Sequence, residues 1–178
     1  MPGPRAGTDR PRPNRAAPLS AARLAAVQAL YQMEIAGAPL EDVLSQFLEF
    51  HRAGVLDEDE APVRPKSALF TQLLRGTTVR RDEIDDILRA ALSPSWPLRR
   101  IEVLLACIMR AGVFELLARP DIPARVVITE YVDIADAFFA DAEKGMANAV
   151  LDAAGQRLRG GEFGETGGAA GVRAAASR

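Results

Sequence analysis

The chain has 178 residues, 48% of them apolar, a formal net charge of −2 and an isoelectric point of about 5.5. These values predict one domain with a real apolar core, and they exclude a protein coated in positive charge for nucleic acid or anionic membranes. The single cysteine, Cys107, excludes an internal disulfide framework. No window of 18 uncharged apolar residues occurs, which excludes a membrane span, and prolines and arginines stand near the N-terminus where a signal peptide would be hydrophobic. We therefore expect a cytoplasmic protein.

The first 18 residues contain five prolines and four arginines and have almost nothing to bury, which predicts a disordered basic arm. The first 23 residues include five arginines and one acidic residue, Asp9, so positive charge is concentrated at this end. Arginine can pair with phosphate and stack on bases, which makes the arm a candidate RNA contact. A merely solubilising tail is the alternative.

Two apolar patterns with helical spacing follow the arm. The first predicts a helix over residues 19–36, with Ser20 as its N-cap and Gly37 as its stop. The second predicts a helix from 40 to about 51. Residues 54–65 are acidic and end at a proline, and we expect this loop to join two packed halves.

Two shorter helical patterns come next. One begins at Leu69 and is predicted to end near Gly76, and the other covers residues 84–92 and is predicted to end at the sequence SPSWP. We expect Trp96, within that sequence, to pack on the junction after the helix.

Residues 98–118 are apolar on nearly every side, which predicts a central, buried helix. Pro123 is suited to opening a further helix that continues to about 140, and a last helix is predicted over 143–159. The glycine-rich and alanine-rich residues 160–178 predict a disordered tail.

No alternating strand pattern is present, so the predicted fold is all-α. We expect about seven helices in two packed helical-bundle subdomains over residues 19–159, between the basic arm 1–18 and the tail 160–178.

Catalytic chemistry has little support in the sequence. His51 and Cys107 lie on predicted apolar faces without a partner at nearby spacing. The carboxylates at 57–60 and between Glu130 and Glu143 are explained by a loop and by solvated helix faces. No glycine-rich phosphate loop and no CxxC pair occurs. We therefore predict no enzyme activity, no metal site and no cofactor.

Five segments nevertheless occur together in one order: VQALYQME after the basic arm, DEIDDIL before Trp96, IMRAGVFELL, RPDIPARVVITEYVDIADAFF and NAVLD. With these segments, residues 15–159 resemble the NusB family of transcription antitermination factors in its α-proteobacterial form. The resemblance implies two small helical subdomains, binding of the single-stranded boxA element of ribosomal RNA leaders, and pairing with NusE, a small-subunit ribosomal protein. It also implies that this complex joins RNA polymerase to suppress termination.

The same resemblance suggests which residues bind. For RNA these are Arg10, Arg12, Arg15, Arg23, Gln28 and Tyr31. Arg23 is the strongest candidate, since a charge in the first turns of a helix is expected to be exposed. Tyr31 could equally belong to a helix core. For NusE the candidates are Leu105, Phe114 and Met146.

This sequence departs from the family pattern at three places. The arginines lie upstream of LSAAR instead of directly before the first helix, Leu105 stands where an acid is common, and Met146 stands where an aromatic is common. Two alternatives therefore stay open: a drifted protein-interaction module with weak or no RNA binding, and a detached NusB-like accessory domain of an RNA methyltransferase.

Overall fold

The computed structural model describes residues 17–52 and 65–164. These residues form seven α-helices and two short 3-10 helices, and they contain no strand, which confirms the all-α prediction. The segments 1–16, 53–64 and 165–178 lie outside the described residues, as do most of the predicted arm and tail and the acidic loop. The elements are α1 (Ala17–Ala36), α2 (Leu40–Arg52), α3 (Ser67–Val79), α4 (Arg81–Ala91), η1 (Leu98–Arg100), α5 (Val103–Ala118), α6 (Ala124–Phe138), α7 (Asp141–Arg159) and η2 (Gly160–Glu162).

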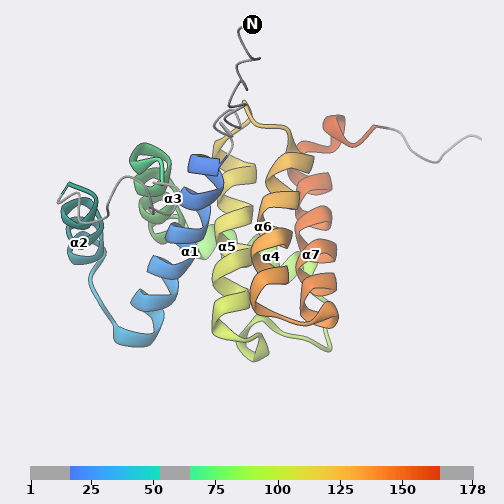
Figure 1. Cartoon of the computed structure of the whole chain (residues 1–178). Helices are drawn as coiled ribbons and strands as arrows, with labels where there is room; N and C mark the ends of the chain where they lie inside the picture. Colours follow the sequence, from blue (N-terminus) through green and yellow to red (C-terminus); the bar gives the residue numbers. More distant parts are fainter. Residues whose placement is uncertain (1–16, 53–64, 165–178) are drawn as a thin grey trace, which may run out of the picture.

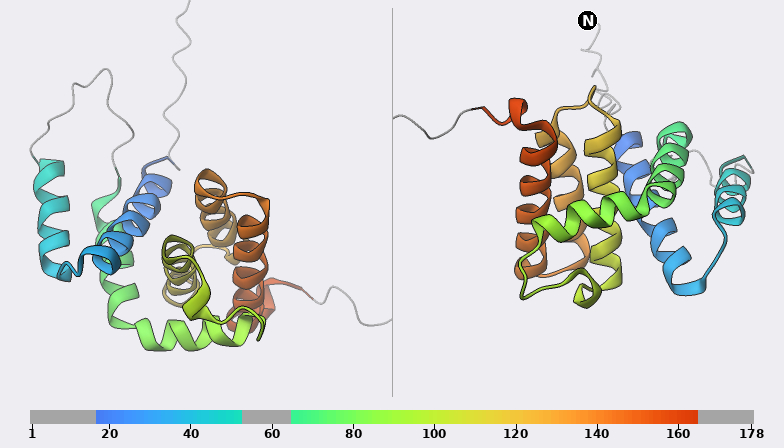
Figure 2. Two further views of the ribbon diagram at one scale, coloured as in Figure 1. Left: turned by 90° about the horizontal axis from the view of Figure 1, so that it is seen from below. Right: turned by 180° about the vertical axis from the view of Figure 1, so that it is seen from behind.

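The helices form two packed groups that meet on α5 (Figure 1). The first three helices lie on one side, and α5, α6 and α7 lie on the other. Helix α4 crosses the back of the molecule, so it lies in front in the rear view of Figure 2. Helix α5 contacts α1, α3, α4, α6 and α7, and the buried apolar side chains of both groups form one continuous core. The predicted central helix is thus confirmed. No helix within 17–52 and 65–164 is long and apolar enough to cross a membrane.

Gly76 does not end a helix, as the sequence pattern suggested, because α3 continues through it to Val79. A Cβ atom at Gly76 would lie 2.0 Å from Cζ of Phe114, which is far inside van der Waals contact. The glycine is therefore a notch in α3 that accepts the Phe114 ring of α5. The prediction failed because a glycine required for close packing has the same local signature as a helix stop.

The ends of α1 show one wrong and one confirmed prediction. The helix begins at Ala17, so Ser20 lies inside it instead of capping it, and Pro18 is tolerated because the first turn needs no amide donor there. Gly37 has a φ of 64° and donates its N–H to the carbonyl of Met33 at 2.9 Å. This left-handed glycine ends the helix as predicted.

Two other segments differ in part from the sequence expectation. Trp96, expected to pack on the junction after α4, has 53% of its surface exposed. Folded structure also continues past residue 160, where the tail was predicted to begin. Residues 160–162 form η2, and Phe163 packs against the core. Its ring lies close to Gly155, where a Cβ atom would be only 2.7 Å away.

The end of α7 ties down the connection between α5 and α6. The Arg159 guanidinium donates hydrogen bonds to four carbonyl oxygens, at distances of 2.6 to 3.1 Å, and Glu162 accepts a bond of 2.7 Å from the N–H of Ala124. The carbonyls belong to Glu115, Leu116, Arg119 and Ile122. The carbonyls of Glu115 and Arg119 also accept backbone N–H bonds, so Arg159 adds a second donor there and gives partners to the carbonyls of Leu116 and Ile122.

Candidate nucleic-acid interface

Helix α1 presents two different faces along its length. Its inward stripe contains the buried residues Ala22, Arg23, Ala26, Val27, Ala29 and Leu30. Gln28, Tyr31 and Ile35 follow one another at intervals of three and four residues and are all exposed. Arg23 therefore lies on the buried face of α1, whereas the other candidate residues of this helix, Gln28 and Tyr31, lie on its exposed face.

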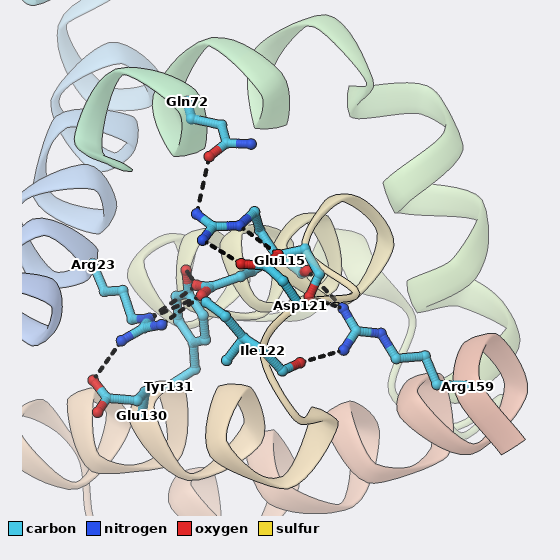
Figure 3. A network of polar contacts seen from close by, with 9 residues as sticks. Arg23, Gln72, Glu115, Asp121, Ile122, Glu130, Tyr131 and Arg159 are labelled. Atoms are coloured by element: carbon cyan, nitrogen blue, oxygen red, sulfur yellow. Dashed lines mark hydrogen bonds and ion pairs between the residues drawn. The ribbon is translucent and has the colours of Figure 1, made fainter. Parts of the chain in front are cut away.

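Arg23 is held by Glu115 of α5 (Figure 3). Its Nε donates to both carboxylate oxygens, at 3.2 and 2.9 Å, and its Nη2 donates to Oε1 at 2.5 Å. Tyr131 of α6 donates its hydroxyl to Oε2 of Glu115 at 2.9 Å, and Nη1 of Arg23 lies 3.2 Å from Glu130. The network joins α1, α5 and α6.

All three central members of this network are shielded from water. Arg23 is 2% exposed, and Glu115 and Tyr131 are fully buried. Burial alone would lower the pKa of Arg23, but the hydrogen bonds and charge of Glu115 offset this effect and raise the pKa above its ordinary value. Burial, followed by the charge of Glu115, raises the pKa of Tyr131. The guanidinium is therefore charged and the phenol neutral, as the hydrogen bonds require.

The expectation that Arg23 is exposed is thus wrong. A guanidinium with its fork on a buried carboxylate cannot contact a phosphate without leaving that carboxylate unpaired, and such a change is costly. Arg23 fastens the first helix to α5 and α6. Because Glu115 neutralises its charge, Arg23 does not contribute to the excess of positive charge near the N-terminus.

The other RNA candidates fare differently. Gln28 is exposed and Tyr31 has 37% of its surface exposed, so both side chains are accessible on α1. Tyr31 is not a core residue. Arg10, Arg12 and Arg15 lie outside the described residues. The RNA-binding role of Gln28, Tyr31 and these three arginines therefore stays a prediction.

The candidates for NusE binding are mostly internal. Leu105 and Phe114 are buried, and Met146 is half-buried and packs against the core. The side chains of Leu105 and Phe114 therefore offer no surface to a partner in this conformation. Leucine at position 105 is explained by its place in the core, where an acid would need a counter-charge.

The described residues contain no group of three histidine, cysteine, aspartate or glutamate side chains placed to hold a metal ion. Burial raises the pKa of the Cys107 thiol to about 11, so it is not a thiolate at neutral pH. Glu130 is not merely part of a solvated face, because it approaches Arg23, whereas Asp136 pairs with Lys144 on the surface at 2.7 Å.

Glu115 is the residue that inspection of the sequence missed. It sits in the apolar run VFELL, where a charge on a buried helix has to find a partner. That signal was present, but the partner lies 92 residues away in the chain. Only the packing of α1 on α5 identifies it.

Comparison with known proteins agrees with this architecture. A sequence model of the NusB family matches residues 20–156. Transcription antitermination protein NusB of Bradyrhizobium diazoefficiens is 48% identical over 144 residues, covering 81% of this chain and 87% of that protein. The NusB protein of Nitrobacter hamburgensis is 48% identical over 143 residues, covering 80% of this chain and 89% of that protein.

Solved structures show the same fold. A structure titled T. maritima NusB superposes with a TM-score of 0.65 at 27% identity, covering 81% of this chain and 95% of that one. A structure of the antitermination factors NusB and NusE in complex with double-stranded RNA gives a TM-score of 0.62 at 21% identity, covering 78% and 96%. The chain belongs to the NusB family.

Proposed function

We propose that this protein is a non-enzymatic transcription antitermination factor that binds the single-stranded boxA element of ribosomal RNA leaders together with NusE. In this proposal the complex acts on RNA polymerase in the cytoplasm to suppress termination. Its relatives in B. diazoefficiens and N. hamburgensis are transcription antitermination proteins, and one structural neighbour is a complex of NusB and NusE with double-stranded RNA.

The proposal of RNA binding rests on the exposed face of α1 formed by Gln28, Tyr31 and Ile35, which we call the outward stripe. Gln28 can hydrogen-bond to base edges, and the exposed ring of Tyr31 can stack on a base. This stripe lies on the helix that begins directly after the arginine-rich residues 1–16. A strand lying along α1 would meet a polar and aromatic surface in the helix and arginines beyond its N-terminus.

The arginine requirement can be tested with full-length protein. Binding of boxA-like RNA would be titrated against salt, with and without NusE, for the wild type and for a variant with Arg10, Arg12 and Arg15 all changed to Gln. If each arginine neutralises one phosphate, the slope of log affinity against log salt falls by about 2 in the variant. An unchanged slope would remove these arginines from the interface.

A single-charge control tests whether losing positive charge elsewhere on the protein weakens RNA binding. Arg157→Gln changes an exposed arginine near the end of α7 and removes one positive charge from the folded body. It should leave boxA affinity almost unchanged, because α7 does not carry the outward stripe. Failure of the wild type to bind boxA RNA at low salt, both alone and with NusE, would refute RNA binding.

One observation favours the alternative of a protein-interaction module with weak RNA binding. Arg23, the one arginine of α1, is engaged with Glu115 and is unavailable to phosphate. In that alternative, deleting residues 1–16 leaves NusE binding intact and RNA adds nothing to the complex. The relatives compared above are antitermination proteins, which gives the methyltransferase accessory domain no support.

A further inference from the structure

The described residues form a positively charged hollow away from α1. It has a volume of about 520 Å³ and lies between the C-terminal end of α4, the segment 92–98, η1 and the middle of α5. Its lining includes three arginines from three different elements, Arg89, Arg99 and Arg110, and one carboxylate, Asp85. We propose that this hollow binds a phosphate group.

The floor of the hollow is a fixed ion pair. Nε and Nη2 of Arg110 donate to the two oxygens of Asp85 at 2.7 and 3.1 Å, and the two side chains are only 12% and 10% exposed. Nε of Arg81 lies 3.9 Å from the same carboxylate. Arg81 is itself paired with Glu34, so Arg110 is the main counter-charge of Asp85. Nη1 of Arg110 has no hydrogen bond to any described residue and can donate to a ligand.

The rim supplies the remaining charge. Arg99 of η1 is exposed and has no ion pair among the described residues, so its whole donor fork is available. Arg89 pairs with Asp86 at 2.5 Å, but both side chains are more than half exposed, and such a pair is weak enough to rearrange. Three arginines against Asp85 give the lining residues a net charge of +2, and Asp86, outside the lining, offsets one of these charges. The C-terminal end of α4 opposes the excess with about half a charge.

The arrangement of hydrogen-bond donors in the hollow favours phosphate over a carboxylate. A carboxylate has two oxygens, and one guanidinium can occupy both, as Arg110 does with Asp85. A phosphate has more acceptor oxygens and can accept donors from several directions at once. Pro94 and Pro97 restrict the backbone of the rim, and Leu92 and Leu98 provide apolar walls that limit hydration of the bound group.

Trp96 provides a direct measurement. It is the only tryptophan in the chain, it is 53% exposed, and it lies between the two prolines that line the hollow. Its fluorescence would be followed in full-length protein during titration with inorganic phosphate, with sodium chloride and sodium acetate at matched ionic strength as references. We expect a saturable change with phosphate alone.

The matched variants are Arg99→Gln, at the rim, and Arg157→Gln, on the exposed surface of α7. Arg99→Gln should weaken the apparent phosphate affinity by about tenfold, and Arg157→Gln should leave it unchanged. A phosphate response no larger than that of chloride, a stronger response to acetate, or equal affinity in Arg99→Gln and wild type would overturn the proposal. Circular dichroism of each variant checks that the helices are intact.

Two further arms identify the source of the phosphate and keep this site separate from RNA binding by α1. A nucleoside monophosphate represents a free ester, and a short oligoribonucleotide without the boxA sequence represents a nucleic-acid backbone. The ligand that binds more weakly to Arg99→Gln than to the wild type is the one whose phosphate occupies the hollow. Changing Arg10, Arg12 and Arg15 to Gln should leave the inorganic phosphate response intact, and loss of that response there would also overturn the proposal.

Discussion

The inward and outward faces of α1 are made from the same short stretch of sequence but have opposite uses. The inward face places Arg23 on Glu115 and Tyr131, away from water, and so contributes to holding the helix on α5 and α6. The outward face leaves Gln28 and Tyr31 accessible. Residue type alone therefore does not say whether a side chain serves a ligand or the fold. On these two faces the charged Arg23 serves the fold, and the uncharged Gln28 and Tyr31 are available to a ligand.

The comparison is tested most strongly by Arg23→Ala. Removing the guanidinium leaves the buried carboxylate of Glu115 without its counter-charge, so the free energy of unfolding should fall by about 3–5 kcal/mol. Denaturant unfolding followed by circular dichroism measures this loss. As a matched control, Arg75→Ala breaks the exposed ion pair with Glu41, and stability should change by no more than about 1 kcal/mol. Similar small losses in both variants would mean that Arg23 is not part of a buried clamp.

Tyr131→Phe should have a smaller effect on the same network. The substitution keeps the ring in the core and removes only the hydroxyl that donates to Glu115 at 2.9 Å. Because Arg23 still neutralises the carboxylate, we expect a loss of about 1–3 kcal/mol in the free energy of unfolding. A variant as stable as the wild type would show that the hydroxyl bond contributes nothing to this clamp.

Alkaline pH should weaken the inward face. In the unfolded chain a tyrosine loses its proton near pH 10, whereas folded Tyr131, with its raised pKa, keeps it. Above about pH 10 the folded state then binds more protons than the unfolded state, so the free energy of unfolding falls as pH rises, by up to about 1.4 kcal/mol per pH unit. Cys107, with a pKa of about 11, adds a similar slope from about pH 9. Unfolding midpoints between pH 8 and 11 should fall less steeply in Tyr131→Phe, and identical slopes would contradict this.

The outward face should respond least in stability and most in binding. Gln28→Ala lies on an exposed helix surface and should change the free energy of unfolding by within about 0.5 kcal/mol. Tyr31→Ala should weaken boxA binding by about 1–3 kcal/mol if its ring stacks on a base. Affinity and unfolding would be measured on the same protein samples. Wild-type RNA affinity in both variants would remove the outward stripe from the proposed interface.

The sequence predicted the helices well because each has its own apolar period. Sequence-based predictions were wrong where one residue type is compatible with two structural roles, and only a contact with a residue distant in sequence distinguishes them. Gly76 has the signature of a stop but is a notch for Phe114, and the sequence had suggested Phe114 as a partner contact although its ring fills that notch. Trp96 was expected to pack on the junction after α4, and more than half of its surface is exposed.

Local composition by itself determined that the chain is helical, that α5 is central, and that positive charge is concentrated before α1, since periodicity and charge density are properties of short segments. Tertiary structure decided which charges are available. Arg23 meets Glu115 across 92 positions, and Arg159 reaches carbonyls up to 44 positions away. Burying a charge requires a partner of opposite sign or a set of hydrogen-bonding groups, and in this fold those partners come from helices distant in sequence.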